Sequence, residues 1–346
     1  MPANAPYLSI VAVSRNDDHG GKLLQRMQIF IDCISEQVSR YQFPVELIIV
    51  EWNPPVDRLP LEQALSWPKP SDYLSIRIIT VPPEVHKKFQ HADVLPLFQM
   101  IGKNVGIRRA KGRFVLATNI DIIFSDELIR FLSQKKLEPG IFYRVDRIDV
   151  DSAIPPGAMI EEKLTYCRTH VIRINSRYYL TSMVNIRGVI SDVIKNPALL
   201  RYYCRNFLYK LKTPCLHYNA CGDFTLMAKE DWVALRGYPE LEMYSLHIDS
   251  LFLMVAYFSG FRETALIPPL VAYHIEHSIG SGITPGAGQR ALFQRLDQVH
   301  IPFLTWRECV EIALQYRDQI RKNKGKNGYN LENWGIFDQA LLESKI

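Results

Sequence analysis

The sequence lacks paired cysteines at the short spacing of a zinc site or a redox motif. Its six cysteines stand apart, at positions 33, 167, 204, 215, 221 and 309. This scatter disfavours a structural zinc site and a disulfide framework, and it is typical of reduced thiols in a cytoplasmic protein.

Long apolar runs are absent too. No segment approaches the roughly 18 apolar residues of a membrane-spanning helix, and the first residues, Met1-Pro-Ala-Asn-Ala-Pro6, have no basic region followed by an apolar one. We therefore expect neither a membrane span nor a signal peptide. At 346 residues, with 47% hydrophobic and 22% charged residues, the chain can bury a sizeable core as one large or two small domains.

Glycine-rich phosphate-binding motifs are also missing. No G-x-G-x-x-G follows the first apolar segment, and no G-x-x-x-x-G-K-[ST] occurs anywhere. A dinucleotide-dependent oxidoreductase and a P-loop nucleotidase are therefore disfavoured. Without such a loop, a divalent metal on a carboxylate is the natural way to hold a diphosphate.

The positive charge is concentrated in one segment. The formal net charge is +5, but residues 155–215 contain ten Lys and Arg against three acidic residues, so the rest of the chain carries −2. The segment also holds six tyrosines. Such a surface suits an anionic glycan, an anionic membrane or a nucleic acid, or else it is a solvated helix pair. Because no recognition-helix or RNP motif is present, we expect no nucleic-acid partner.

The apolar pattern predicts an α/β fold. Apolar strands alternate with amphipathic helices, which implies right-handed crossovers and a mostly parallel sheet flanked by helices. In the first half we expect strands at 7–14, 45–50 and 76–81, with helices near 23–38 and 94–110. In the second half we expect a strand at 221–228, helices at 229–236 and 250–259, and a strand within 261–273.

The segment Lys111–Ser125 is the most informative stretch. Its apolar residues predict a buried strand, with Asn119 and Asp121 placed at the carboxyl end. A buried unpaired carboxylate is costly, so Asp121 implies a cation or a hydrogen-bond network. The alternative is that Asp121 caps a following turn.

Polar side chains recur at the same end of successive expected strands. Arg15 and Asn16 follow the first, Glu51 follows the second, and Asn119 and Asp121 lie at the end of a later one. In open α/β sheets the carboxyl edge is where ligands bind. We therefore expect a nucleotide pocket there.

Taken in order, these residues resemble the family-2-type glycosyltransferases with the GT-A fold. The resemblance spans roughly residues 7–280. It rests on the following features: the first strand, Leu8-Ser-Ile-Val-Ala-Val13; the acidic Glu51; Lys103-Asn104-x-Gly106 with Ala110-x-Gly112; Asn119-x-Asp121; Gly222 to Met227; Gly237-Tyr-Pro-Glu240; and His247-Ile-Asp249. Asn119 departs from the usual D-x-D motif, as do Glu51-Trp52 and Ile248-Asp249 from the usual acidic pairs, which indicates a divergent branch.

The resemblance implies a role for each matching residue. Asp121 would carry Mn²⁺ or Mg²⁺ on the diphosphate of a nucleotide-sugar donor, and His274 or His277 could add a ligand. Lys103, Asn104, Arg108 and Asn119 would line the donor site with Arg15 and Asn16, and Glu51 would accept from the base. Asp249 would be the general base of an inverting transfer, with Asp223 as second choice. Against these roles, either histidine could be a loop residue, Glu51 a surface ion pair and Asp249 a helix N-cap.

The implied architecture is a glycosyltransferase domain over residues 1–286 and a helical C-terminal extension over 287–346. The domain would comprise a donor half (1–150), a helical basic acceptor-side insertion (155–215) and a catalytic half (216–286). The acceptor would be a glycan or a lipid-linked sugar, and the insertion and the tail near Lys322 could touch an anionic membrane peripherally. Two other functions stay open: a non-catalytic nucleotide-sugar-binding protein of the same fold, and a sugar-phosphate nucleotidylyltransferase.

Overall fold

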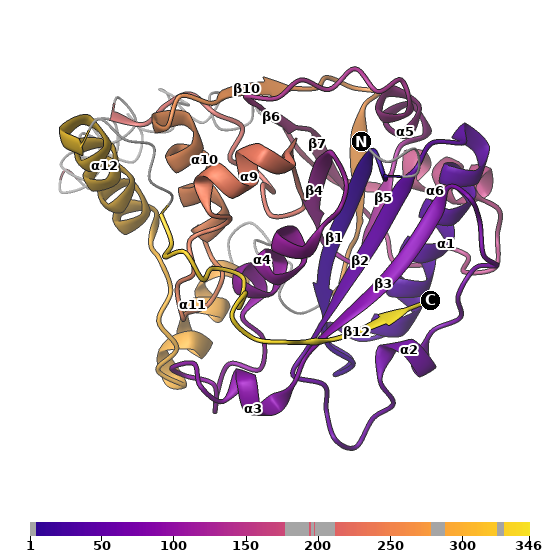
Figure 1. Ribbon diagram of the computed structural model, residues 1–346, viewed down its shortest axis with the longest axis horizontal. Coiled ribbons are helices and arrows are strands. Elements are labelled where there is room, and N and C mark those ends of the chain that lie inside the picture. The colour runs from indigo at the N-terminus through magenta and orange to yellow at the C-terminus, as the bar shows by residue number, and fades with distance from the viewer. Residues whose placement is uncertain (1–4, 177–193, 195–196, 198–211, 278–287, 324–328) are drawn as a thin grey trace.

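Two β-sheets organise the chain (Figure 1). The computed structural model describes residues 5–176, 194, 197, 212–277, 288–323 and 329–346. The larger sheet has eight strands in the order β10 (Arg262–Ala265), β6 (Ile141–Arg144), β9 (Phe224–Ala228), β4 (Phe114–Thr118), β1 (Leu8–Ser14), β2 (Val45–Trp52), β3 (Leu74–Val81) and β12 (Leu342–Lys345). All its strands except β9 and β12 run in one direction, so the expectation of a mostly parallel sheet is confirmed.

The smaller sheet has four strands in the order β5 (Ile122–Phe124), β11 (Val271–Ile275), β7 (Asp146–Val150) and β8 (Val171–Asn175). Strand β11 runs antiparallel to β5 and parallel to β7. Strands β6 and β7 were not anticipated from the sequence, because both are short and β7 alternates charged with apolar residues.

Helices cover both faces of the large sheet (Figure 1). The described helices are α1 (Leu23–Tyr41), α2 (Leu61–Ala64), α3 (Pro83–His86), α4 (Gln99–Arg109), α5 (Asp126–Ser133), α6 (Ile160–Thr169), α9 (Lys229–Leu235), α10 (Ile248–Phe258), α11 (Gly288–Gln298) and α12 (Trp306–Asn323). Of these, α6 packs against the smaller sheet. The observed architecture is thus α/β with a large, mostly parallel sheet between helices, compatible with a Rossmann-like fold. Among the described residues, no helix combines the length and apolar character needed to cross a bilayer.

The strands divide their side chains between two cores. Along β1, Ile10 and Ala12 join the core under α1 and α5, whereas Val11 and Val13 join the core under α4, α9 and α10. This follows from the period of two in a strand, which sends successive side chains to opposite faces. Both faces of β1 are therefore buried, which explains its continuous apolar sequence.

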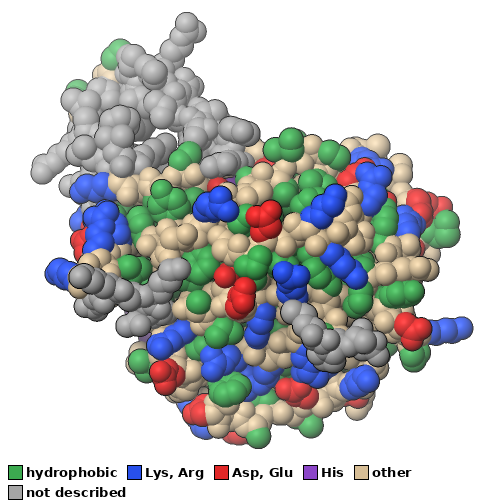
Figure 2. All heavy atoms as spheres, turned by 45° about the horizontal axis from the view of Figure 1, so that its top comes forward, with side chains coloured by type: hydrophobic (Ala, Val, Ile, Leu, Met, Phe, Trp, Pro, Cys, Tyr) green, Lys and Arg blue, Asp and Glu red, His purple; other side chains and the backbone are tan. Residues whose placement is uncertain are grey.

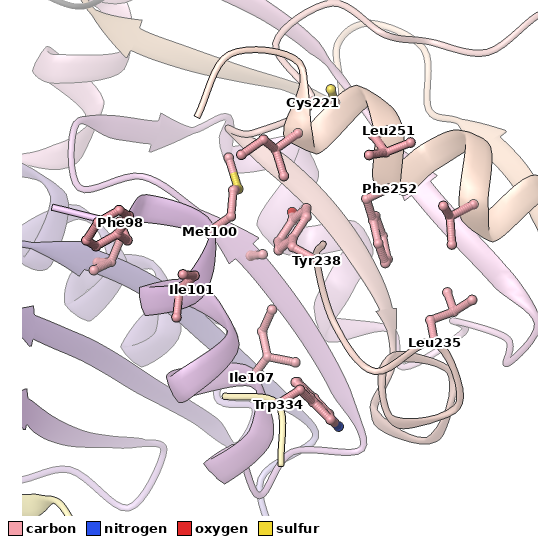
Figure 3. Packing of buried hydrophobic residues seen from close by; sticks show 14 of the residues in the cluster. Phe98, Met100, Ile101, Ile107, Cys221, Leu235, Tyr238, Leu251, Phe252 and Trp334 are labelled. Carbon is pink, nitrogen blue, oxygen red and sulfur yellow. The ribbon is translucent and has the colours of Figure 1, made fainter. Parts of the chain in front are cut away.

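The C-terminal strap (residues 329–346) runs across α4 and ends as β12 beside β3 (Figure 1). Its Trp334 is buried in the same core as Ile107 and Leu235, which Figure 3 shows. The guanidinium of Arg109 donates to the carbonyl oxygens of Gly335 at 2.7 Å and Ile336 at 2.8 Å. The expectation of an entirely helical C-terminal extension is therefore wrong, because the chain ends in a strand that pairs with β3.

Two further expectations need correction. The stretch expected as one strand up to Phe124 is two strands in different sheets, because the chain leaves the large sheet after Thr118. The basic insertion is not purely helical, since its described part contains the helix α6 and the strand β8. Residues 177–193, 195–196 and 198–211 of the insertion lie outside the described residues, and so do most of its tyrosines.

Surface charge of both signs is interspersed on the face drawn in Figure 2, where Lys and Arg side chains lie among Asp and Glu side chains and apolar ones. A mixed surface of this kind agrees with the mild net charge of the whole chain.

Candidate functional site

The segment Asn119-Ile120-Asp121 joins the two sheets, leading from β4 to β5. Thr118 anchors its start, with its hydroxyl donating to the carbonyl oxygen of Asp223 at 2.7 Å. At its end, the amide of Ile275 donates to the carbonyl oxygen of Asp121 at 3.0 Å. This second bond brings the end of β11, and the histidines near it, beside Asp121.

The carboxylate of Asp121 is buried among three cationic or potentially cationic groups. Its Oδ2 lies 2.8 Å from Nη1 of Arg26, 3.1 Å from Nε2 of His277 and 3.8 Å from Nε2 of His274. Burial alone would raise the pKa of Asp121, but the two histidines and Arg26 outweigh it and hold this pKa well below its usual range. The group is therefore an anion at neutral pH.

These residues can hold a metal ion. One ligand atom from each of Asp121, His274 and His277, together the aspartate–histidine group, lies within 4.8 Å of the others. A second possible set, Asp149, His274 and Glu276, shares one histidine with the first. The fit is supported by Oδ1 of Asp121, which is buried and accepts no hydrogen bond from the described residues. A buried carboxylate oxygen in that state suits a cation.

Asp149 continues the network behind His274. Its carboxylate lies 3.2 Å from Nδ1 of His274, 2.8 Å from Nε of Arg147 and 2.5 Å from Nη2 of Arg173. Burial would raise the pKa of Asp149, but His274, Arg147 and Arg173 outweigh it and keep that pKa low. Burial would lower the pKa of His274, but Asp121 and Asp149 raise it instead. An imidazole between two carboxylates is held in one orientation, as a carboxylate that accepts from one ring nitrogen orients a histidine whose other nitrogen binds a metal.

Arg147 and Asn119 connect this network to the start of β9. Nη1 of Arg147 lies 2.6 Å from Oδ2 of Asp223, and the amide nitrogen of Asn119 donates to Oδ1 of the same carboxylate. The amide oxygen of Asn119 accepts from Nε2 of Gln99 at 2.9 Å. Asp223 is therefore held by charge and hydrogen bonds on both oxygens.

Lys103 lies beneath the same region, fully buried in α4. Its Nζ donates to the carbonyl oxygen of Gly222 at 2.6 Å. Burial lowers its pKa to about 8, and Asp223 and Asp249 offset only part of that effect. A Cβ at Gly222 would lie 3.0 Å from Oδ2 of Asp249, so Asp249 stands next to the same turn. The structure thus brings together Lys103, Asp223 and Asp249.

The residues at the ends of β1 and β2 form a second group. The carboxylate of Glu51 accepts from the backbone amide of Leu61 at 2.9 Å. The side-chain amide of Asn16 donates to the carbonyl oxygen of Leu59 at 2.8 Å. Nε of Arg15 donates to the carbonyl oxygen of Asn53 at 2.6 Å. Burial raises the pKa of Glu51. These three side chains hold the segment from Asn53 to Leu61 against the edge of the sheet.

Two residues of α4 point elsewhere. Asn104 donates to the carbonyl oxygen of Tyr238 at 2.8 Å and to Glu240 at 2.9 Å, so it fixes the Gly237–Glu240 turn. The guanidinium of Arg108 lies over the rings of Trp334, at 4.7 Å, and Phe337, at 4.4 Å. The structure places both side chains in contact with other segments rather than with the aspartate–histidine group.

Three residues of the site were not anticipated: Arg26, Arg147 and Asp149. A signal existed for Arg26, because it lies three residues after Leu23 and four before Phe30, on the inner face of the predicted helix. Asp149 and Arg147 alternate with Ile148 and Val150 in β7, and nothing in that pattern shows which face is buried.

No protein-family model matches the chain, and no curated protein matches it. The interpretation of the site therefore rests on its geometry.

Proposed function

We propose that the chain is a metal-assisted glycosyltransferase with a GT-A-type fold, which moves a sugar from a nucleotide-diphosphate sugar to an acceptor hydroxyl. The observation that carries this proposal is the aspartate–histidine group at the point where the chain leaves the end of β4. Ligand sites in open α/β sheets lie at the carboxyl ends of the strands.

The donor set favours Mn²⁺ over Mg²⁺. Two imidazoles and one carboxylate suit a borderline ion, whereas Mg²⁺ prefers carboxylates, water and phosphate oxygens. When bound, the metal would neutralise negative charge on the departing diphosphate, an effect worth several kcal/mol. Asp149 and Arg147 would keep His274 oriented for this task.

Asp249 is the better candidate for the general base. Both oxygens of Asp223 are engaged, by Arg147 and by Asn119, which leaves it poorly placed to accept a proton. Asp249 is half-buried in the first turn of α10, where it accepts from the adjacent amide of Ser250 at 2.8 Å and from the thiol of Cys221, and no cation pairs with it among the salt bridges of the described residues. A positioned base typically contributes about 10²–10⁴-fold to such a transfer. This arrangement would give inversion at the sugar carbon, with a glycan or lipid-linked sugar as acceptor.

A second candidate is a nucleotide-sugar-binding protein of the same fold without turnover. The ion pair between Arg26 and Asp121 favours it, because a guanidinium already neutralises the carboxylate that would hold the metal. Both candidates bind a nucleotide diphosphate, and only the first breaks the glycosidic bond of the donor.

The test is a panel of nucleotide sugars incubated with the purified protein and Mn²⁺ or Mg²⁺, with release of nucleoside diphosphate as the readout. We expect slow hydrolysis of one donor that is abolished by Asp121→Ala and by excess chelator. Asp126→Ala is the matched control, because Asp126 pairs with Arg40 on the surface and should not affect turnover.

Unchanged turnover in Asp121→Ala and in chelator would disprove the metal assignment. Metal-dependent thermal stabilisation by a nucleoside diphosphate, with no hydrolysis of any donor, would select the binding protein instead.

A further inference from the structure

The ion pair between Arg26 and Asp121 leaves one atom on each partner unused. Nη1 of Arg26 lies 2.8 Å from Oδ2 of Asp121, and Nη2 donates to the carbonyl oxygens of His19 and Gly21. Nε of Arg26 and Oδ1 of Asp121 are both buried and have no hydrogen-bond partner among the described residues. Because most buried polar atoms are paired, two such atoms in one ion pair point to a ligand.

The two unused atoms have opposite chemistry. A carboxylate oxygen only accepts, so Oδ1 calls for a cation or a donor. The Nε–H of a guanidinium only donates, so it calls for an anionic oxygen, and arginine is well suited to phosphate. A divalent cation that carries a diphosphate presents both groups side by side.

Neither half of such a ligand fits well alone. An isolated cation on Oδ1 would meet the positive charge of Arg26, which already neutralises the carboxylate. An isolated diphosphate on Nε would meet the negative charge of Asp121. When both arrive together, each ligand charge faces an opposite charge of the protein, and the local charge stays balanced.

We propose that Arg26 and Asp121 form a coupled receptor that binds a divalent cation and a diphosphate together and binds either alone weakly. This inference rests on the proposed function, since it describes how the donor and its metal enter the site. Arg26 acts here as a binding residue for the diphosphate, and its charge suppresses binding of the free metal.

The experiment is isothermal titration calorimetry of the full chain with Mn²⁺, with inorganic pyrophosphate and with both, corrected for the complex that the two form in solution. Pyrophosphate serves because every nucleotide-sugar donor contains a diphosphate. We expect each ligand to strengthen binding of the other by the same factor, about tenfold or more, within the range common for coupled sites.

Two variants separate the roles of the arginine. Arg26→Gln removes the charge that repels the cation, so Mn²⁺ alone should bind about tenfold or more tightly and the coupling should fall close to one. Arg26→Lys keeps a positive charge but lacks Nε, so Mn²⁺ alone should bind as in the parent protein while the coupling falls.

The matched control is Arg77→Gln, which breaks another buried arginine–carboxylate pair, with Glu46 at 2.8 Å. It should lower thermal stability without changing the affinity for Mn²⁺ or the coupling. Circular dichroism of every variant shows whether it is folded. If Arg26→Gln does not fold, Arg26→Lys still tests the inference.

The inference is overturned if Mn²⁺ binds the parent protein equally well with and without pyrophosphate, or if folded Arg26→Gln has unchanged Mn²⁺ affinity. Turnover of a donor by a protein without this coupling would leave the proposed function standing and remove the inference. Coupling without turnover would support the inference and select the non-catalytic alternative.

Discussion

The amide nitrogen of Asn119 donates a hydrogen bond to the carboxylate of Asp223, across the junction between β4 and β9. Under the proposed function, Asn119 stands where a D-x-D motif would have its first aspartate. An aspartate there would set two carboxylates against each other, whereas the amide satisfies one oxygen of Asp223 and accepts from Gln99. An asparagine at position 119 therefore fits its neighbours Asp223 and Gln99 better than an aspartate would.

Asn119→Asp should therefore be destabilising in metal-free protein, by about 1–3 kcal/mol at pH 7, the cost of an unmade buried hydrogen bond. The new carboxyl would have a raised pKa in the folded state, because it faces Asp223. The Asn119→Asp protein should therefore keep its stability at low pH and lose it as the pH rises through that raised pKa. Urea unfolding with chelator at pH 5 and pH 8 measures this, and an equal loss at both values would contradict it.

Lys103 should make the stability depend on pH in alkaline solution. Burial lowers its pKa to about 8 in the folded chain, against about 10.4 when unfolded. Between these values the unfolded chain binds the extra proton, so the unfolding free energy rises with pH. The stability of the parent protein relative to Lys103→Met should increase by about 3 kcal/mol from pH 8 to pH 10.5. If the difference in unfolding free energy between the two proteins does not change with pH, the buried ammonium of Lys103 is stabilised by its surroundings and the prediction is wrong.

Asp249→Asn should leave donor binding intact and reduce transfer by about 10²–10⁴-fold, the usual contribution of a general base. The substitution keeps the size of the side chain, and asparagine is also a good residue at the start of a helix. Calorimetry with the donor and an assay of transfer measure the two effects. The structure makes His247, not Asp249, the N-cap residue of α10. If Asp249 has only a structural role in the first turn of α10, both binding and transfer will persist.

Gly20→Ala should weaken binding of Mn²⁺ in the presence of pyrophosphate by about tenfold or more. A Cβ at this position would overlap Nδ1 of His277 and lie 3.0 Å from Nη2 of Arg26. Gly21→Ala is the matched control, because both glycines have positive φ, +74° and +76°, but a Cβ at Gly21 meets no atom within 4 Å. Both variants should share a backbone cost of about 1–2 kcal/mol. Equal metal affinities would show that His277 is not a ligand.

Trp334→Ala should destabilise the protein by about 3–5 kcal/mol, as expected for a large aromatic removed from a core. Trp334 is 1% exposed, whereas Phe337, on the same strap, is 57% exposed. Phe337→Ala should therefore cost much less. Thermal unfolding measures both, and binding of Mn²⁺ to either folded variant should be unchanged because neither residue belongs to the aspartate–histidine group.

The elements whose signals are local could be predicted from the amino-acid sequence. The apolar runs of β1, β2 and β3 and the periodic apolar residues of α1 are properties of neighbouring residues, so the alternation of strands and helices could be predicted. The same runs predicted a parallel sheet, and they placed Asp121 near a strand end. The strand β12 gave no such signal, since Leu342–Lys345 is largely polar and pairs through its backbone with β3.

Which charged side chains pair with each other became visible in the folded chain alone. Arg26 and Asp121 are 95 residues apart, and Arg147 and Asp223 are 76 apart, so their pairing depends on how α1, β7 and β9 return to one place. The folded chain also showed that Asn119-Ile120-Asp121 is a passage between two sheets rather than the end of one strand. An ion pair or an unpaired oxygen has a large effect on free energy when it is buried. Burial arises from the packing of the whole chain, so a pattern along the sequence does not show it.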